Sequence, residues 1–263
     1  MEIRGAELPE RSDADRVLRF DSGVIVLDGA SSYDRAVPPA ARYVDALGSA
    51  LAHCLDAGAA VPAALAEAIR ITAERLGLSR GAAPSSAIAV VQVWPETVEV
   101  LVLGDITVVV GSGHGSCELF SDDRMDALAL PERTEYRRRL AAGSGYDDTH
   151  RALLRGLQRG QRARRNRDHG YWIAEADPVA AAHAVRRSYP RATVEWVVLA
   201  TDGAHETLAV FDIPWPEIAA RSATGLHRLL VRCHDWEADI DPDGRLLPRA
   251  KRHDDKAIAV LRP

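Results

Sequence analysis

Short runs of apolar and β-branched residues, separated by turn residues, constrain the fold of this chain more than any other feature. They are densest in 86–120, where proline and glycine residues divide the segment into consecutive short runs. Runs of this kind predict strands, and strands so close in sequence pair most simply as an antiparallel meander. The expected strands cover 17–20, 24–27, 88–94, 98–103, 106–110, 117–120, 171–173, 194–200 and 257–261.

Stretches with helical character stand between these strands. The segment 62–76, for example, spaces Glu67, Arg70 and Glu74 along one exposed helical face. The expected helical segments are 40–59, 62–76, 122–168, 178–187 and 214–233. Strands followed by helices, then strands again, do not show the strict alternation of a doubly wound parallel sheet. We therefore expect an α+β fold in which two sheets form a sandwich with helices outside.

Length and composition fit one globular domain. A chain of 263 residues can bury one large core, and 47% apolar with 27% charged residues is ordinary for such proteins. We expect residues 1–263 to form a single domain. The net charge of −5 argues against a general nucleic-acid binder, whose binding domain is usually basic.

Neither the cysteines nor the first residues indicate export. The three cysteines are widely spaced and form no C-x-x-C pair, so they support neither a disulfide framework nor a zinc knuckle. The opening residues lack the apolar core of a secretory signal, and no stretch reaches the roughly 18–20 apolar residues that span a bilayer. We expect a cytoplasmic protein with no membrane partner.

Aspartates stand directly beside several of the predicted strands. They occur in Asp28-Gly29, Gly104-Asp105, Asp202-Gly203 and Asp254-Asp255. A hard divalent cation needs several oxygen ligands at one point, and strand ends hold ligands more rigidly than loops do. One Asp-Gly pair alone is typical of a turn, but the repeated pattern predicts a metal site assembled from distant segments.

Taken in order, these segments resemble the metal-dependent serine/threonine protein phosphatases of the 2C type, over nearly the whole chain. The resemblance rests on Asp13-Ala14-Asp15, Val24 to Gly29, Pro84 to Ala87, Leu103-Gly104-Asp105, Val198 to Gly203 and Arg252 to Ala257. It implies a four-layer αββα sandwich of two antiparallel sheets flanked by helices. It also implies a phosphatase that hydrolyses phosphate monoesters, by default phosphoserine and phosphothreonine in proteins.

The resemblance further implies a metal centre with two Mg²⁺ or Mn²⁺ ions. Asp28 would bridge the two ions, the Gly29 carbonyl would add a ligand to one, and Asp202 with Asp254 would complete the other. Asp105 with Asp202 would help to bind a third, weaker ion. Two cations roughly 3.5–4 Å apart lower the pKa of a bridging water, and the resulting hydroxide attacks phosphorus in line.

The same resemblance assigns a phosphate clamp to an arginine before the opening acidic motif, since the guanidinium fork matches phosphate oxygens. Arg11 is the candidate, and with Asp28 and Asp202 it makes up the expected catalytic set. It stands one residue closer to Asp15 than the pattern requires, so another arginine could take this role.

The chain departs from the family pattern at several positions. Ala30-Ser31-Ser32 replaces a glycine-rich loop and the histidine that some members use as a general acid. Ala14 replaces an acidic residue, and Asp255 replaces an asparagine, which adds a carboxylate near the site. His205 and His253 lie close in sequence to expected ligands and are candidates to reach the metal region.

Residues 122–168 are expected to form an Arg-rich helical flap or insertion. The arginines at 151–167 allow three interpretations: a solvated helical face, a surface that recognises an acidic or phosphorylated substrate, or a nucleic-acid surface. The negative net charge weakens the third.

Other functions stay open from the sequence alone. A small phosphorylated metabolite is the alternative substrate. A catalytically silent domain of the same fold that binds a phosphorylated partner is a different class of function, and a metal-free structural protein would use the aspartates only as caps and turn residues.

Overall fold

The computed structural model describes residues 1–9, 14–30, 37–113 and 115–263. Its strands form two five-stranded antiparallel sheets. One sheet has the order β2 (Arg16–Phe20), β3 (Gly23–Gly29), β4 (Ser86–Val93), β5 (Thr97–Leu103) and β8 (Val185–Pro190). The other has the order β1 (Glu2–Leu8), β10 (Lys256–Arg262), β9 (Val194–Ala200), β6 (Thr107–Ser112) and β7 (Cys117–Phe120).

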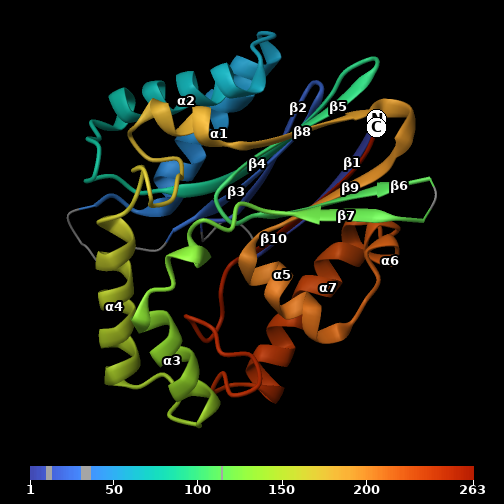
Figure 1. Cartoon of the computed structure of the whole chain (residues 1–263). Helices are drawn as coiled ribbons and strands as arrows, with labels where there is room; N and C mark the ends of the chain where they lie inside the picture. The colour runs from blue at the N-terminus through green and yellow to red at the C-terminus, as the bar shows by residue number, and fades with distance from the viewer. Residues whose placement is uncertain (10–13, 31–36, 114) are drawn as a thin grey trace.

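The sheets pack face to face, and helices cover both outer surfaces (Figure 1). The first sheet is covered by α1 (Ala40–Asp56) and α2 (Val61–Leu76). The second is covered by α5 (Asp202–Leu208), α6 (Trp215–Ala219) and α7 (Ala223–Asp235). The expected α+β fold with a four-layer αββα arrangement is confirmed.

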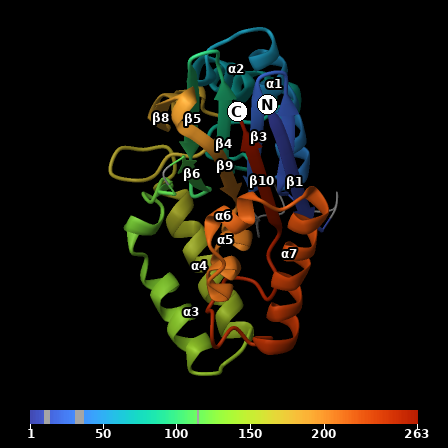
Figure 2. The same cartoon turned by 90° about the vertical axis from the view of Figure 1, so that its right-hand side faces the viewer.

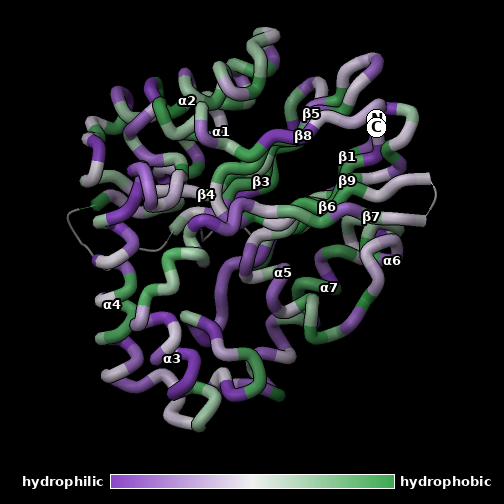
Figure 3. The backbone as a smooth tube through the Cα atoms, viewed as in Figure 1, coloured by the Kyte–Doolittle hydropathy of each residue, from purple (hydrophilic) through white to green (hydrophobic). Residues whose placement is uncertain are grey.

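The strand β3 shows why the central runs are apolar throughout. Ile25 and Leu27 contact the layer of α1 and α2, whereas Val24 and Val26 contact the opposite sheet. Because both faces of the strand are covered, apolar residues occupy consecutive positions instead of alternating with polar ones. Figure 3 shows the same pattern, with apolar strands in the centre of the molecule and polar positions on the outer helices.

The predicted meander over 86–120 is wrong in one respect. β4 pairs with β5, and β6 pairs with β7, but β5 and β6 belong to different sheets. The chain crosses between sheets at Gly104, whose φ of 93° is accessible mainly to glycine. The crossing places Asp105 at the end of the sandwich, between the two sheets.

Two further expectations of secondary structure fail. Residues 171–173 form no strand: Tyr171 makes an isolated bridge with Arg165, and the next residue but two, Ala174, makes one with Ser86 of β4. The alanine-rich segment is a short 3₁₀ helix at Pro178–His183 that leads into β8. The sequence predicts no strand before residue 17, where the structure has β1 at Glu2–Leu8. Both β1 and β8 are edge strands, and each forms because a neighbouring strand offers unpaired backbone groups.

The helices α3 (Pro131–Ala141) and α4 (Asp148–Arg162) lie at one end of the sandwich, below both sheets in Figure 2. They share a small apolar cluster that includes Leu140 and Leu154. His150 Nε2 lies 2.8 Å from the Ala250 carbonyl oxygen, and the Tyr146 hydroxyl donates to the Lys251 carbonyl at 3.2 Å. These bonds join the helical segment to the chain just before Asp254.

The first and last strands of the described chain are direct neighbours. In the β1–β10 pair, Glu2 is opposite Arg262, and both ends of the chain lie at the end of the sandwich away from α3 and α4 (Figure 1). None of the helices formed by the described residues is both long and apolar enough to cross a membrane.

Candidate functional site

Aspartates from four distant segments line one cleft at the end of the sandwich. Asp28 comes from the end of β3, Asp105 from the crossing between β5 and β6, Asp202 from the start of α5, and Asp254 from the segment before β10. Gly29 lines the same cleft, whose volume is 1330 Å³. The structure thus brings together every expected metal-site residue. Arg11 lies outside the described residues.

Glycines allow two of these segments to approach one another closely. A Cβ atom on Gly203 would stand 2.1 Å from the Asp255 carbonyl oxygen, and one on Gly29 would stand 2.4 Å from the Ala14 Cβ. The backbone N–H of Gly29 also donates to the Ala14 carbonyl at 3.1 Å. The glycines after Asp28 and Asp202 are therefore required for packing, and Gly203 fixes Asp202 beside Asp254.

The clustered carboxylates repel one another electrostatically. Burial, followed by the charges of Asp15 and Asp202, raises the pKa of Asp28 well above its ordinary value. Burial and then Asp202 raise the pKa of Asp105 to about 7. Burial and then Asp254 raise the pKa of Asp202. Carboxyl groups that disfavour ionisation together are stabilised as anions by a cation placed among them.

Asp15, from the expected opening motif, belongs to the same group. Its side chain is buried, its Oδ2 has no hydrogen-bond partner, and burial is the first cause that raises its pKa. An unpartnered buried carboxylate oxygen is costly unless a ligand satisfies it. Asp255, in contrast, accepts the Ala14 backbone N–H at 2.9 Å, so one of its oxygens holds the opening segment in place.

The donor set fits a pair of hard cations. All the converging side-chain ligands are carboxylate oxygens, which Mg²⁺ and Mn²⁺ prefer. Within the described part of the chain, no three of these aspartates bring their oxygens within 4.8 Å of one another. Asp28, Asp202 and Asp254, which the family resemblance assigns to one ion, would therefore have to move closer together to share it.

Lys251 is a site residue that the sequence reasoning missed. Its Nζ lies 2.5 Å from Asp254 Oδ1, and the nearby carboxylates raise the pKa of the lysine despite its burial. Its ammonium group therefore balances part of the negative charge at the cleft. No periodicity or motif marks Lys251 in the sequence, and only the folded segment brings it to Asp254.

Asp122 and the two candidate histidines, His205 and His253, differ in how they relate to the cleft. Asp122 accepts the Gly104 N–H at 3.3 Å and so supports the turn that carries Asp105. His205 lines the cleft, and its ring stacks on that of Trp215, with the two ring centroids 5.9 Å apart. His253 does not line the cleft, and its Nδ1 lies 3.2 Å from Glu237 Oε2 instead.

Arginines of α4 form the opposite wall of the cleft. Arg155, Gln158, Arg159 and Arg162 line it at helical spacings of three and four residues, which place them on one face. Among the described residues, no carboxylate pairs with Arg155 or Arg159. We call Arg155, Gln158, Arg159 and Arg162 the cationic stripe. The cleft therefore has an acidic wall on the sandwich and a basic wall on α4.

Among the comparisons with known proteins, only the comparison with solved structures finds proteins similar to this chain. Neither a scan against protein-family models nor a search of curated proteins finds a match. The catalytic domain of the serine threonine protein phosphatase PstP, in complex with two manganese ions, shares 13% identity, covers 98% of this chain and 96% of its own, and has a TM-score of 0.52.

Two further solved structures of serine/threonine phosphatases show the same structural similarity. The PPM Ser-Thr phosphatase MsPP from Mycobacterium smegmatis, in complex with cacodylate, has 15% identity, coverage of 99% and 97%, and a TM-score of 0.55. The serine/threonine phosphatase Stp1 from Staphylococcus aureus has 10% identity, coverage of 100% and 94%, and a TM-score of 0.56. The chain therefore has the fold of the bacterial serine/threonine phosphatases of the 2C type.

Proposed function

We propose that this protein is a metal-dependent phosphatase that hydrolyses phosphate monoesters, with phosphoserine and phosphothreonine in proteins as its substrates. The observation that carries the proposal is the convergence of Asp28, Asp105, Asp202 and Asp254 in one cleft of a phosphatase fold. Aspartates that served only as helix caps or turn residues would not be expected to line one common cleft.

In this proposal Asp28 and the Gly29 carbonyl would hold one of two Mg²⁺ or Mn²⁺ ions, and Asp28, Asp202 and Asp254 would hold the other. Asp105 with Asp202 would contribute to a third. When bound, such ions would supply a water of lowered pKa and positive charge beside the phosphoryl oxygens. The chain's own contribution is to fix the ligands: strand ends and close glycine contacts hold the carboxylates where repulsion would otherwise separate them.

Arg11 remains the proposed phosphate clamp, and Arg137 is the alternative within the described cleft. Arg137 lines the cleft and pairs with Glu206 at 3.5 Å. Arg11→Ala should raise KM for p-nitrophenyl phosphate much more than Arg137→Ala does. A larger rise with Arg137→Ala would transfer the clamp to that residue.

The cleft favours a protein substrate over a small metabolite. Its volume of 1330 Å³ exceeds the roughly 300–1,000 Å³ usual for small-molecule pockets. Its basic wall, with the cationic stripe, complements a peptide segment that carries acidic side chains beside the phosphorylated residue. We therefore propose acidic phosphoprotein segments as the preferred substrates, with no role for nucleic acid.

Hydrolysis of p-nitrophenyl phosphate with Mn²⁺ or Mg²⁺ tests the activity. Asp28→Asn and Asp202→Asn should each lower kcat/KM by about 1,000-fold, since losing an ion removes several kcal/mol of transition-state stabilisation. Asp123→Asn, which changes an exposed carboxylate of the same cleft, is the matched control and should keep its activity. Absence of turnover with both metals would favour a silent phospho-partner binding domain.

Phosphopeptides with acidic or neutral flanks test the substrate class. Arg155→Ala with Arg159→Ala should raise KM several-fold for the acidic peptide and leave the neutral one nearly unchanged, because exposed charge pairs are worth roughly 0.2–1 kcal/mol each. Arg151→Ala is the control: Arg151 lies on α4 but pairs with Asp148 and does not line the cleft. Equal effects on both peptides would contradict charge recognition.

A further inference from the structure

A second group of possible metal ligands lies beside the cleft, on the α7 side of the segment that carries Asp254. It consists of His234, Glu237 and His253, whose ligand atoms all lie within 4.8 Å of one another. Glu237 lines the cleft, whereas His234 and His253 do not, and the donor set differs from the all-carboxylate set there. The proposed phosphatase activity assigns no role to this group.

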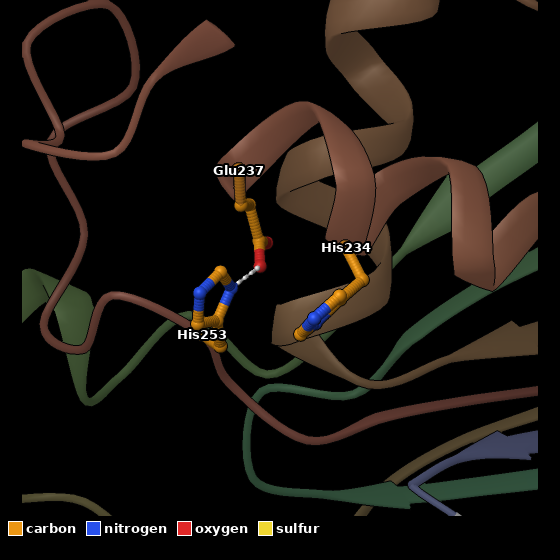
Figure 4. Close-up of side chains that lie close together, drawn as sticks. All are labelled: His234, Glu237 and His253. Carbon is orange, nitrogen blue, oxygen red and sulfur yellow. Dashed lines mark hydrogen bonds and ion pairs between the residues drawn. The ribbon is translucent and has the colours of Figure 1, made fainter. Parts of the chain in front are cut away.

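Two elements bring the group together, as Figure 4 shows. His234 lies in the last turn of α7, and Glu237 follows three residues later in the turn Trp236–Ile240, so both side chains share a face. His253 comes from the segment before β10. The centroids of the two imidazole rings are 4.3 Å apart, and His253 Nδ1 lies 3.2 Å from Glu237 Oε2.

The carboxylate of Glu237 is held in one orientation by its neighbours. Its Oε1 accepts the Thr207 hydroxyl at 2.8 Å and lies 2.7 Å from Lys256 Nζ. Both Glu237 and Lys256 are buried. Since Oε1 is fixed in this way, Oε2 is the oxygen that faces the histidines. Outer contacts of this kind orient ligands in known metal sites.

The chemistry of these donors selects the class of metal. Two imidazole nitrogens and one carboxylate oxygen suit Zn²⁺ and similar transition ions, whereas Mg²⁺ prefers oxygen ligands only. Around a tetrahedral Zn²⁺, ligand atoms stand about 3.4 Å apart, so the ligand atoms, which lie within 4.8 Å of one another, need to close by up to about 1.4 Å. Both histidines reach solvent and can make that adjustment while Glu237 stays fixed.

We infer that His234, Glu237 and His253 bind one Zn²⁺ ion or a similar transition-metal ion, with a fourth position left to water. Lys256 already balances the charge of Glu237, so the affinity should be weaker than that of closed four-ligand sites. A bound ion would connect the end of α7 to the residue before Asp254 and so fix the position of that segment.

Zinc titration of the full chain without a histidine tag tests the inference. Asp28→Asn with Asp202→Asn serves as the background, because it removes the cleft carboxylates as competing ligands and makes the result independent of phosphatase activity. A chromophoric chelator that competes for Zn²⁺ should report one equivalent bound. His234→Ala or His253→Ala should weaken binding by at least about tenfold.

His227→Ala is the matched control, since His227 lies on the same helix, about 10 Å or two turns away. It should leave the affinity unchanged. Tetrahedral Co²⁺ absorption in the same background should appear with the parent and His227→Ala proteins and disappear with His253→Ala. Failure of the background protein to bind Zn²⁺, or equal binding by all three histidine variants, would overturn the inference.

Discussion

Replacing Asp105 by asparagine should stabilise the metal-free protein at pH 8. The pKa of Asp105 rises from its usual 3.8 to about 7 in the folded state. Between these values the unfolded chain has released a proton that the folded chain still holds, so stability falls as pH rises from about 4 to about 7 and then stays level. Asparagine keeps the shape of the side chain and removes this loss.

The size of the effect follows from the same pKa difference. About three units at ~1.4 kcal/mol each give an upper limit of about 4 kcal/mol. Asp105 is only partly buried at the cleft, so solvent screening reduces this figure, and we expect a gain of about 2 kcal/mol at pH 8. The gain should shrink to a few tenths of a kcal/mol near pH 4.

Urea denaturation in the presence of EDTA, at pH 8 and near pH 4, measures this difference. Asp123→Asn, an exposed carboxylate of the same cleft, should change stability by less than about 0.5 kcal/mol at either pH. Adding Mn²⁺ at pH 8 should stabilise the parent protein more than Asp105→Asn. A loss of stability in metal-free Asp105→Asn at pH 8, or a gain independent of pH, would refute the electrostatic reasoning.

Three other changes probe the structure. Lys256→Met leaves the buried Glu237 carboxylate without its cation and should cost about 3–5 kcal/mol in urea denaturation; a cost below 1 kcal/mol would contradict the pairing. Gly203→Ala places a Cβ 2.1 Å from the Asp255 carbonyl and should cost about 1–3 kcal/mol and weaken Mn²⁺ binding measured by calorimetry. Asp147→Ala removes the cap that accepts the His150 N–H at 2.7 Å, and should cost about 1 kcal/mol with faster amide exchange at the start of α4; unchanged exchange there would exclude that role.

The central strands could be predicted because their environment is the same on both sides. β3, β9 and β10 are covered on one face by helices and on the other by the opposite sheet, so their sequences are apolar at consecutive positions. Such runs are visible without knowledge of the partner strand. The helices α1 and α2 were also predicted close to their observed bounds, since alanine and leucine favour the helix locally.

The edge strands could not be predicted in the same way. The strand β8 contains Arg186, Arg187 and Ser188, and it forms because β5 offers unpaired backbone groups. Nothing in the local sequence reports that partner, so the alanines before it suggested a helix. The assignment of β6 to the second sheet was missed for a related reason. A tight turn at Gly104 has the same sequence signature whether the next strand pairs with β5 or crosses to the other sheet.

At the candidate site, strand ends marked the aspartates, but the charges that face them were not visible. Asp28 and Asp202 each follow an apolar run, which is a local signal. Lys251 and the buried pair of Glu237 with Lys256 depend on contacts between segments. A lysine in sequence is read as exposed, and only folding shows that one of these is enclosed.

The pairing of the first strand with the last has a practical consequence. Because Glu2 and Arg262 are opposite one another, a short linker could join the two ends of the chain, and new ends could then be opened in an exposed turn elsewhere. Fluorophores or surface tethers attached at these two strand ends would label or immobilise the protein on the side remote from the cleft.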